Sequence, residues 1–155
     1  MEFAIVKVDK NNYVLFDEMV FFRKHGRERD ENEKASIQIA NKIYDTLEDK
    51  NLYVLAAQTE QKFIGWISAV YIPKISWTNG RGHLFIDELW VNPVYRRNGI
   101  AHALMRHIDV IAQELDAIGL RLYVNANNDE AHALYKKCGY SNTGEAFFME
   151  KGNGA

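Results

Sequence analysis

Hydrophobic residues recur along the chain with two different periods, which predict a mixture of helices and strands. Apolar residues at helical spacing predict helices over residues 14–25, 37–47 and 100–115, the last one ended by Gly119, and a short helix that Asn128 caps and Gly139 closes. Short runs rich in β-branched and aromatic residues predict strands over residues 3–8, 52–57, 62–71, 84–91, 120–124 and 147–150. The stretch 26–34 is dense in both charges and is expected to be a solvated loop.

The order of these elements predicts an α+β fold, a mixed α/β arrangement. The second, third and fourth strands follow one another through turns at 58–61 and 79–82, so we expect them to form an antiparallel meander. The length of 155 residues suits one domain, and we expect it to span residues 1–155.

Composition narrows the class of protein. The apolar share of 47% and the charged share of 26% are ordinary for a soluble globular protein, and a net charge of −2 argues against a general nucleic-acid binder. The single cysteine, Cys138, excludes an internal disulfide framework and a multi-cysteine zinc site. The N-terminal residues lack the features of a secretion signal, and no apolar run is long enough to span a bilayer. We therefore expect a cytoplasmic protein with no membrane, metal or nucleic-acid partner.

The segment from Leu89 to Ala101 carries the first candidate chemistry. An apolar strand stops at Pro93, a loop with two arginines follows, and Gly99 opens the long helix. The first turn of a helix has unpaired amides and a partial positive charge, so a phosphate could approach closely there. Tight packing at Gly99 and a solvated arginine loop are the alternatives. The spacing matches neither a dinucleotide-binding nor a P-loop motif.

The segment from Asn128 to Tyr140 carries the second candidate chemistry. Ala131, Leu134, Tyr135 and Cys138 share one face of the short helix, so the phenol of Tyr135 is expected to point inward, near the sheet. It could donate a proton there, or it could be a core tyrosine with a satisfied hydroxyl.

Together the two segments resemble the GNAT superfamily of N-acetyltransferases. The family motif Arg/Gln-x-x-Gly-x-Gly/Ala is matched from Arg96 to Ala101, after the lead-in Val-x-Pro-x-Tyr from Val91 to Tyr95. The motif Asn-x-x-Ala-x-x-Leu-Tyr-x-x-x-Gly-Phe/Tyr is matched from Asn128 to Tyr140. The detailed match covers residues 84–140, and the element order extends it over nearly the whole chain.

The resemblance implies a GNAT-like acyl-CoA N-acyltransferase fold, in which about four helices flank a twisted, mostly antiparallel sheet. It also implies acetyl-CoA as the acyl donor, with the diphosphate on the amides of the loop and helix start and the pantetheine arm along the preceding strand. The implied cofactor-binding residues are Leu89, Trp90, Val91, Arg96, Arg97, Asn98, Gly99, Ile100, Ala101, His102, Asn128 and Tyr135.

The resemblance implies direct transfer of the acetyl group to a primary amine. Tyr135 matches the residue that protonates the leaving thiolate, and the Val91 amide is the expected donor to the thioester carbonyl. Glu88 is the first candidate for the base, and under strict alternation Asp87 would face the other way. Some family members carry a glutamate on the following strand where this chain has Tyr123, so a water-mediated relay stays open.

The acceptor is expected to be a small-molecule amine. In the family the acceptor site is bordered by loops that correspond here to 26–34 and 73–82. A peptide or protein amine, or a non-catalytic acyl-CoA-binding module on the same fold, are the alternatives. A homodimer is a further expectation from the family.

Overall fold

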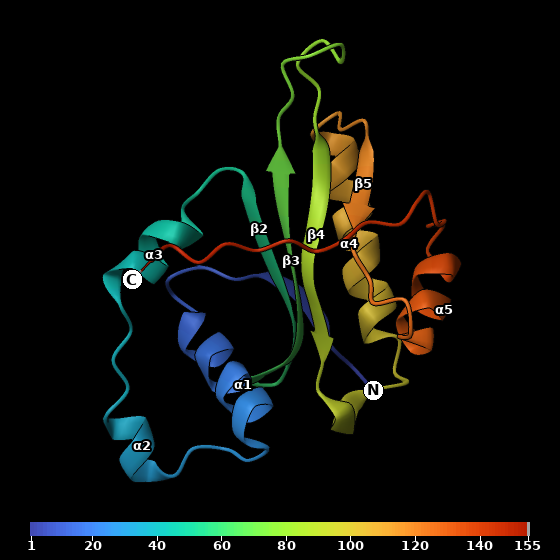
Figure 1. Cartoon of the computed structure of the whole chain (residues 1–155). Helices are drawn as coiled ribbons and strands as arrows, with labels where there is room; N and C mark the ends of the chain where they lie inside the picture. Colours follow the sequence, from blue (N-terminus) through green and yellow to red (C-terminus); the bar gives the residue numbers. More distant parts are fainter. Residues whose placement is uncertain (155) are drawn as a thin grey trace. The chain divides into compact units, whose positions relative to one another are not determined.

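The computed structural model describes residues 1–154, which fall into two compact units, Met1–Tyr123 and the part of the chain from Val124 onward (Figure 1). The strands of the first unit are β1 (Ala4–Lys7), β2 (Leu52–Thr59), β3 (Lys62–Ile72), β4 (His83–Val91) and β5 (Gly119–Leu122). Its helices are α1 (Tyr13–His25), α2 (Glu31–Ala35), α3 (Asn41–Leu47) and α4 (Ile100–Glu114), with a 3-10 turn at Pro93–Tyr95. The second unit contains α5 (Asp129–Lys137).

The five strands form one sheet in the order β1-β2-β3-β4-β5. Every neighbouring pair is antiparallel except β4 and β5, which run parallel because α4 lies between them along the chain. The predicted antiparallel meander of β2, β3 and β4 is therefore confirmed, and so is the α+β fold class.

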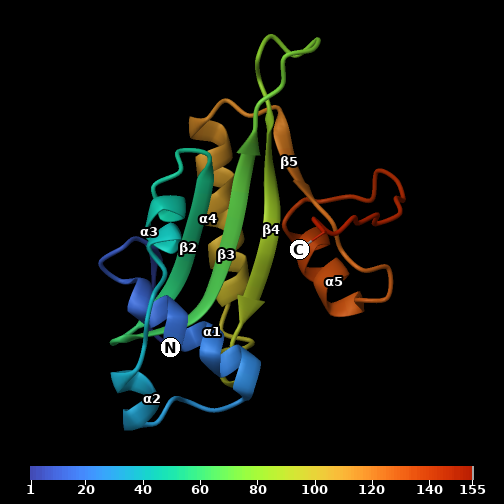
Figure 2. The ribbon, with the colours of Figure 1, turned by 60° about the vertical axis from the view of Figure 1, so that its left-hand side comes forward.

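Helices cover both faces of this sheet (Figure 2). The helix α4 buries Ile100, Leu104, Met105, Ile108 and Ala112 along one stripe. Each fully buried aliphatic side chain of this kind stabilises the fold by about 1.5–3 kcal/mol. On the opposite face, α1 places Phe16 edge-to-face against Trp66 of β3, with ring centroids 5.2 Å apart. Packing on both faces thus holds β4 and the start of α4 in fixed positions.

The strands β4 and β5 pair over only part of the length of β4. Their register runs from His83↔Gly119 to Ile86↔Leu122, whereas β4 continues to Val91. Residues 88–91 of β4 are therefore paired with β3 on one side and present the other edge to no strand of this sheet.

Several predicted elements differ in detail. Residues 147–150 are not a strand, and Phe147, Phe148 and Met149 are 96%, 77% and 90% exposed. A strand needs a neighbour to complete its backbone hydrogen bonds, and no strand is described in residues 124–154. Gly119 does not end the long helix: it begins β5, and the turn before it contains Asp116 with φ 50°.

The charged stretch 26–34 is not entirely a loop. The Asp30 side chain accepts from the Glu33 amide, and the Glu33 side chain accepts from the Asp30 amide, which makes a capping box that starts α2. Residues 37–40 are not helical, because Ala40 is extended and α3 begins only at Asn41. Within residues 1–154, every helix is too short or too polar to cross a bilayer.

Candidate functional site

The turn that joins β4 to α4 is held rigid by its own side chains. Asn92 is buried, and its Oδ1 accepts from the Val94 amide at 3.0 Å. The side-chain Nδ2 of Asn98 donates to the backbone carbonyls of Tyr95 and Arg96, at 2.9 and 3.2 Å. Two asparagines therefore hold the backbone on either side of the arginine pair.

The backbone at the start of α4 forms a concave group of amides. Gly99 is the N-cap with φ 77°, and the first helical bond runs from the Ala103 amide to the Gly99 carbonyl at 3.0 Å. The amides of Ile100 and Ala101 consequently have no intrahelical acceptor. A Cβ atom at Gly99 would meet nothing within 4 Å, so the space in front of these amides is open. A left-handed residue followed by a helical one directs successive amides toward one point, an arrangement that suits an anion.

The open edge of β4 leads directly to these amides. The Asn92 amide donates to the Ile64 carbonyl of β3 at 2.8 Å, so the backbone groups of Asn92 point toward β3. Backbone groups of successive residues in a strand point to alternate sides, and those of Val91 therefore point to the open edge. The guanidinium Nε of Arg96 donates to the Val91 carbonyl at 3.2 Å, in agreement with this direction. The Val91 amide and the first turn of α4 thus border the same opening.

The structure brings together the predicted residues from Leu89 to His102 in this one segment. The side chains of these residues, however, lie in different surroundings. The ring of Trp90 lies on the α1 face of the sheet, with its centroid 5.2 Å from that of Trp66, and its backbone groups point toward β3 because those of Val91 point away, so Trp90 does not face the open edge. Ile100 is a buried core residue, and the side chain of Arg96 ties the turn to the end of β4.

The prediction of strict alternation at Asp87 and Glu88 is wrong. Ser68 pairs with Glu88 and Ala69 with Ile86, so Asp87 is an extra residue in a β-bulge. A bulge places two successive residues opposite one partner and changes the direction of their side chains. Both carboxylates are exposed, and Glu88 lies on the same face as Trp66 and Trp90.

Glu88 is accompanied by an arginine from α1. Arg23 Nη1 donates to Glu88 Oε2 at 3.4 Å, and the two side chains are 46% and 51% exposed. The Arg23 guanidinium lies 5.1 Å from the ring centroid of Trp66 and 5.8 Å from that of Trp90. A carboxylate, a cation and two indole rings are therefore grouped beside the end of β4.

The two predicted residues of the second unit lie on or next to α5. The Asn128 side chain accepts from the Ala131 amide at 3.1 Å, which confirms it as the N-cap. Tyr135 is half-buried, with its ring 6.0 Å from that of Tyr140. Burial, followed by the nearby Cys138, raises the pKa of the Tyr135 phenol above its usual value. The phenol therefore stays protonated, as a proton donor must.

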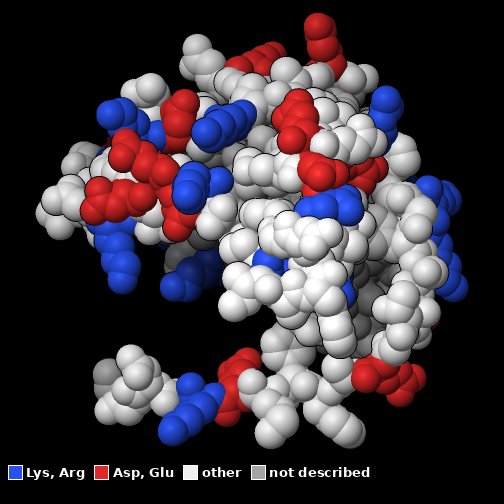
Figure 3. Space-filling view, turned by 90° about the horizontal axis from the view of Figure 1, so that it is seen from above, with Lys and Arg blue, Asp and Glu red and all other residues white. Residues whose placement is uncertain are grey.

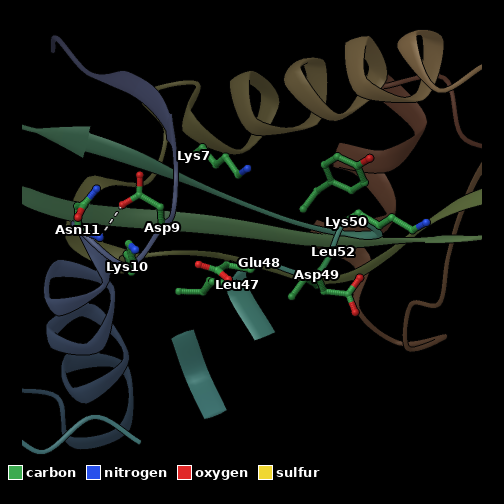
Figure 4. A pocket seen from close by; sticks show the side chains of 10 residues that line it. Lys7, Asp9, Lys10, Asn11, Leu47, Glu48, Asp49, Lys50 and Leu52 are labelled. Atoms are coloured by element: carbon green, nitrogen blue, oxygen red, sulfur yellow. Dashed lines mark hydrogen bonds between the residues drawn. The ribbon is translucent and has the colours of Figure 1, made fainter. Parts of the chain in front are cut away.

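Two hollows in the surface lie elsewhere. One, of ≈ 390 Å³, is lined by residues of both charges around β1, the end of α3 and the start of β2, including Lys7, Asp9 and Glu48 (Figure 4). The other, of ≈ 300 Å³, lies between α1 and α2 and includes Asp17 and Arg29. Neither includes a residue of the β4–α4 segment. On the face shown in Figure 3, acidic and basic side chains are interspersed.

The loop 73–82 does not border this region. It precedes His83 at the start of β4, whereas the turn to α4 follows Val91 at the other end. Figures 1 and 2 show it extending beyond the sheet, and its Ile75 and Trp77 are almost fully exposed. The expectation that this loop borders the acceptor stays a prediction, and the loop leaves β4 at the end opposite the turn to α4. The segment that follows α1 lies at the same end as Arg23.

Sequence reasoning missed Arg23 and Asn92. Arg23 belongs to the basic last turn of α1, together with Lys24 and His25, which the sequence presents only as a common helix ending. Asn92 precedes a proline, a signal of a capped turn that the sequence does carry.

Comparisons with known proteins agree with this geometry. The model of the acetyltransferase (GNAT) family matches residues 15–140. Human N-acetyltransferase 8 is 32% identical over 92 residues, which cover 59% of this chain and 40% of that protein. The match thus spans less than half the length of this curated relative.

Solved structures show the same fold. An aminoglycoside acetyltransferase from an uncultured soil metagenomic sample has a TM-score of 0.79 and 21% identity, covering 98% of this chain and 100% of its own. AAC(6')-Iy in complex with the bisubstrate analogue CoA-S-monomethyl-acetylneamine has a TM-score of 0.75 and 14% identity, covering 97% of this chain and 99% of its own. At these identities the likeness concerns the fold alone.

Proposed function

Because the chain belongs to the acetyltransferase (GNAT) family of enzymes, we propose that it transfers an acetyl group from acetyl-CoA directly to a primary amine of a small molecule. The observation that carries this proposal is the junction of the open β4 edge with the first turn of α4, where the amides of Ile100 and Ala101 have no intrahelical acceptor. This junction offers hydrogen-bond donors to an extended amide-bearing arm and to a diphosphate in succession.

The residues at the junction fit the two chemical groups of the donor molecule. Acetyl-CoA supplies an acetyl group activated as a thioester. The amides of Ile100, Ala101 and His102, with the charge of Arg97, would hold its diphosphate in the open space in front of Gly99. The outward backbone groups of Leu89 and Val91 would hold the pantetheine arm of acetyl-CoA, in the way that an extended peptide adds a strand to a sheet edge.

Val91 is placed to stabilise negative charge at the reacting carbonyl. Its amide points to the open edge, and the surrounding packing holds it there without reorganisation. A donor of this type typically lowers the barrier by about 3 kcal/mol.

Two side chains would move protons. An alkyl ammonium has a pKa of about 10.4, so the acceptor must lose a proton before its nitrogen can attack. Glu88, exposed beside the end of β4, would accept that proton directly or through water. Tyr135, matched to the family motif, would donate a proton to the departing thiolate, whose pKa is about 8.5 as a free thiol.

The small-molecule acceptor is supported by the neighbours described as aminoglycoside acetyltransferases. A peptide or protein amine remains the alternative substrate. Cytoplasmic location, a homodimer and a single catalytic domain over residues 1–155 are part of the same proposal. Light scattering would test the homodimer by measuring the molar mass of the protein in solution.

The experiment is a thiol-release assay with acetyl-CoA against panels of small amines and peptides, combined with calorimetric titration of acetyl-CoA. We expect acetyl-CoA to bind and at least one small amine to accelerate thiol release. Binding without turnover on any amine would favour the non-catalytic module. Turnover confined to peptides would move the acceptor to that class, and an absence of binding would reject the proposal.

A further inference from the structure

One position in the stripe of α1 that packs on the sheet is occupied by a charged residue. Phe16 and Met19 lie on the face of α1 that contacts the cluster around Trp66, and Arg23 follows at helical spacing on that face. A hydrophobic residue would continue the stripe, and departures from such a pattern are expected at functional positions.

The Arg23 guanidinium is held in place but keeps most of its donors. It lies over the rings of Trp66 and Trp90, and Trp66 is itself fixed by Phe16. Of its five N–H groups, one makes a long hydrogen bond, to Glu88 at 3.4 Å, within residues 1–154. An exposed pair of this length contributes little to stability, so the contact with Glu88 does not by itself account for the placement of Arg23.

Neighbouring cations have their donors engaged differently. Arg27 makes two hydrogen bonds to the Glu33 carboxylate, at 2.8 and 3.2 Å. Arg29 bridges Asp17 and Glu18 at 2.6 and 3.1 Å, and Lys62 is paired with Glu28. Among these four cations, Arg23 is the one whose carboxylate contact is single and long, and it lies beside the proposed base.

We propose that Arg23 and Glu88 together recognise a zwitterion, so that the acceptor is a free amino acid whose carboxylate binds Arg23 while its amino group faces Glu88. This inference rests on the proposed function and names the substrate class for the same site. A planar guanidinium stacked on an aromatic ring is suited to bind a carboxylate through two parallel hydrogen bonds. An adjacent cation and anion on the protein complement the adjacent anion and cation of an amino acid.

The proposal disfavours acceptors that carry amino groups and no carboxylate. A polyamine or an aminoglycoside would place a second cation near Arg23, where like charges repel. An amino acid places its carboxylate there instead, next to a basic helix turn that also contains Lys24 and His25.

The test compares the free amino acids with their carboxamides, which have nearly the same shape but lack the carboxylate charge. We expect kcat/KM in the thiol-release assay to be about 10- to 100-fold higher for the preferred acid than for its amide, the range of one charged hydrogen-bonded pair. Arg23→Gln should reduce this ratio to about 1, and Arg23→Lys should retain part of it. Arg106→Gln, which removes an exposed arginine from α4 on the other face of the sheet, should leave the ratio unchanged.

A ratio near 1 in the unmodified protein, or a ratio that survives in Arg23→Gln, would overturn the inference. So would turnover of simple amines that exceeds turnover of every amino acid, while the proposed acetyl transfer would stand. If acetyl-CoA binds but no amine is turned over, calorimetric titration of the same acids and amides into the protein saturated with coenzyme A decides the matter. Tighter binding of an acid that is lost in Arg23→Gln supports the inference, and equal binding of acid and amide rejects it.

Discussion

The proposed placement of a diphosphate at Gly99 predicts that a negative charge introduced there weakens binding of acetyl-CoA about 100-fold without unfolding the protein. The substitution Gly99→Glu directs a carboxylate into the open space in front of the α4 amides, because a Cβ at this position meets nothing within 4 Å. Gly99→Gln has the same length and no charge, and it is the matched control.

Both substitutions carry the same conformational cost. Gly99 has φ 77°, and a residue with a side chain in this left-handed region costs roughly 1–2 kcal/mol. A carboxylate near a helix N-terminus is favourable by about 0.3–1 kcal/mol, so the Glu variant should be at least as stable as the Gln variant. Thermal unfolding followed by circular dichroism should therefore give similar midpoints, slightly higher for Glu.

The two variants should differ in affinity. Two unit charges ~5 Å apart at an effective dielectric constant of ~20 repel by about 3 kcal/mol. This corresponds to a Kd about two orders of magnitude higher for Gly99→Glu than for Gly99→Gln. Isothermal titration with acetyl-CoA measures both values. Equal affinities in the two folded variants would refute the location of the diphosphate and, with it, the assignment of the β4–α4 junction.

Three further predictions follow from particular contacts. Tyr135→Phe should lower kcat by about 10²-fold with little change in the KM for acetyl-CoA, because the phenol is proposed to act as a general acid; unchanged turnover removes it from the mechanism. Hydrogen bonds from Arg27 and from the Asp30 amide lower the pKa of the exposed Glu33 carboxyl to about 2, so its stabilising effect is present above the unfolded pKa of about 4.3 and is lost as the pH falls toward 2. The difference in melting temperature between the unmodified protein and Glu33→Gln should therefore shrink over that window, and a constant difference contradicts the pairing. Gly65→Ala should destabilise the protein by about 1–3 kcal/mol in denaturant titrations, because a Cβ there would lie 2.9 Å from the Trp90 carbonyl oxygen; an unaltered midpoint would show that β4 shifts at no cost.

The turn proposed to bind the diphosphate was predictable because it is local. Val91, Gly99 and the first turn of α4 lie within one short segment, and the end of a strand, a glycine and an amphipathic helix in succession produce unpaired amides wherever the segment folds. The predicted residues from Leu89 to His102 lie in this one segment, and their cofactor-binding role stays a prediction.

The proposed acceptor side of the site was not predictable in the same way. Arg23 and Glu88 are 65 residues apart, and their contact depends on how α1 crosses β3 and β4. The bulge at Asp87 depends on the register of β4 against β3, which the alternation of residues within one strand does not contain.

The amino-acid sequence alone determined the class of fold, most of the element order and the location of the strand–glycine–helix segment proposed to bind a diphosphate, because these depend on the periodicity and chemistry of neighbouring residues. Tertiary structure alone decided which face Glu88 occupies, that Arg23 accompanies it, that the loop 73–82 leaves β4 at the far end and that residues 147–150 have no strand partner. The physical reason is that backbone pairing and side-chain packing join residues distant in the chain. Their geometry is settled only when whole elements bury their apolar faces against one another.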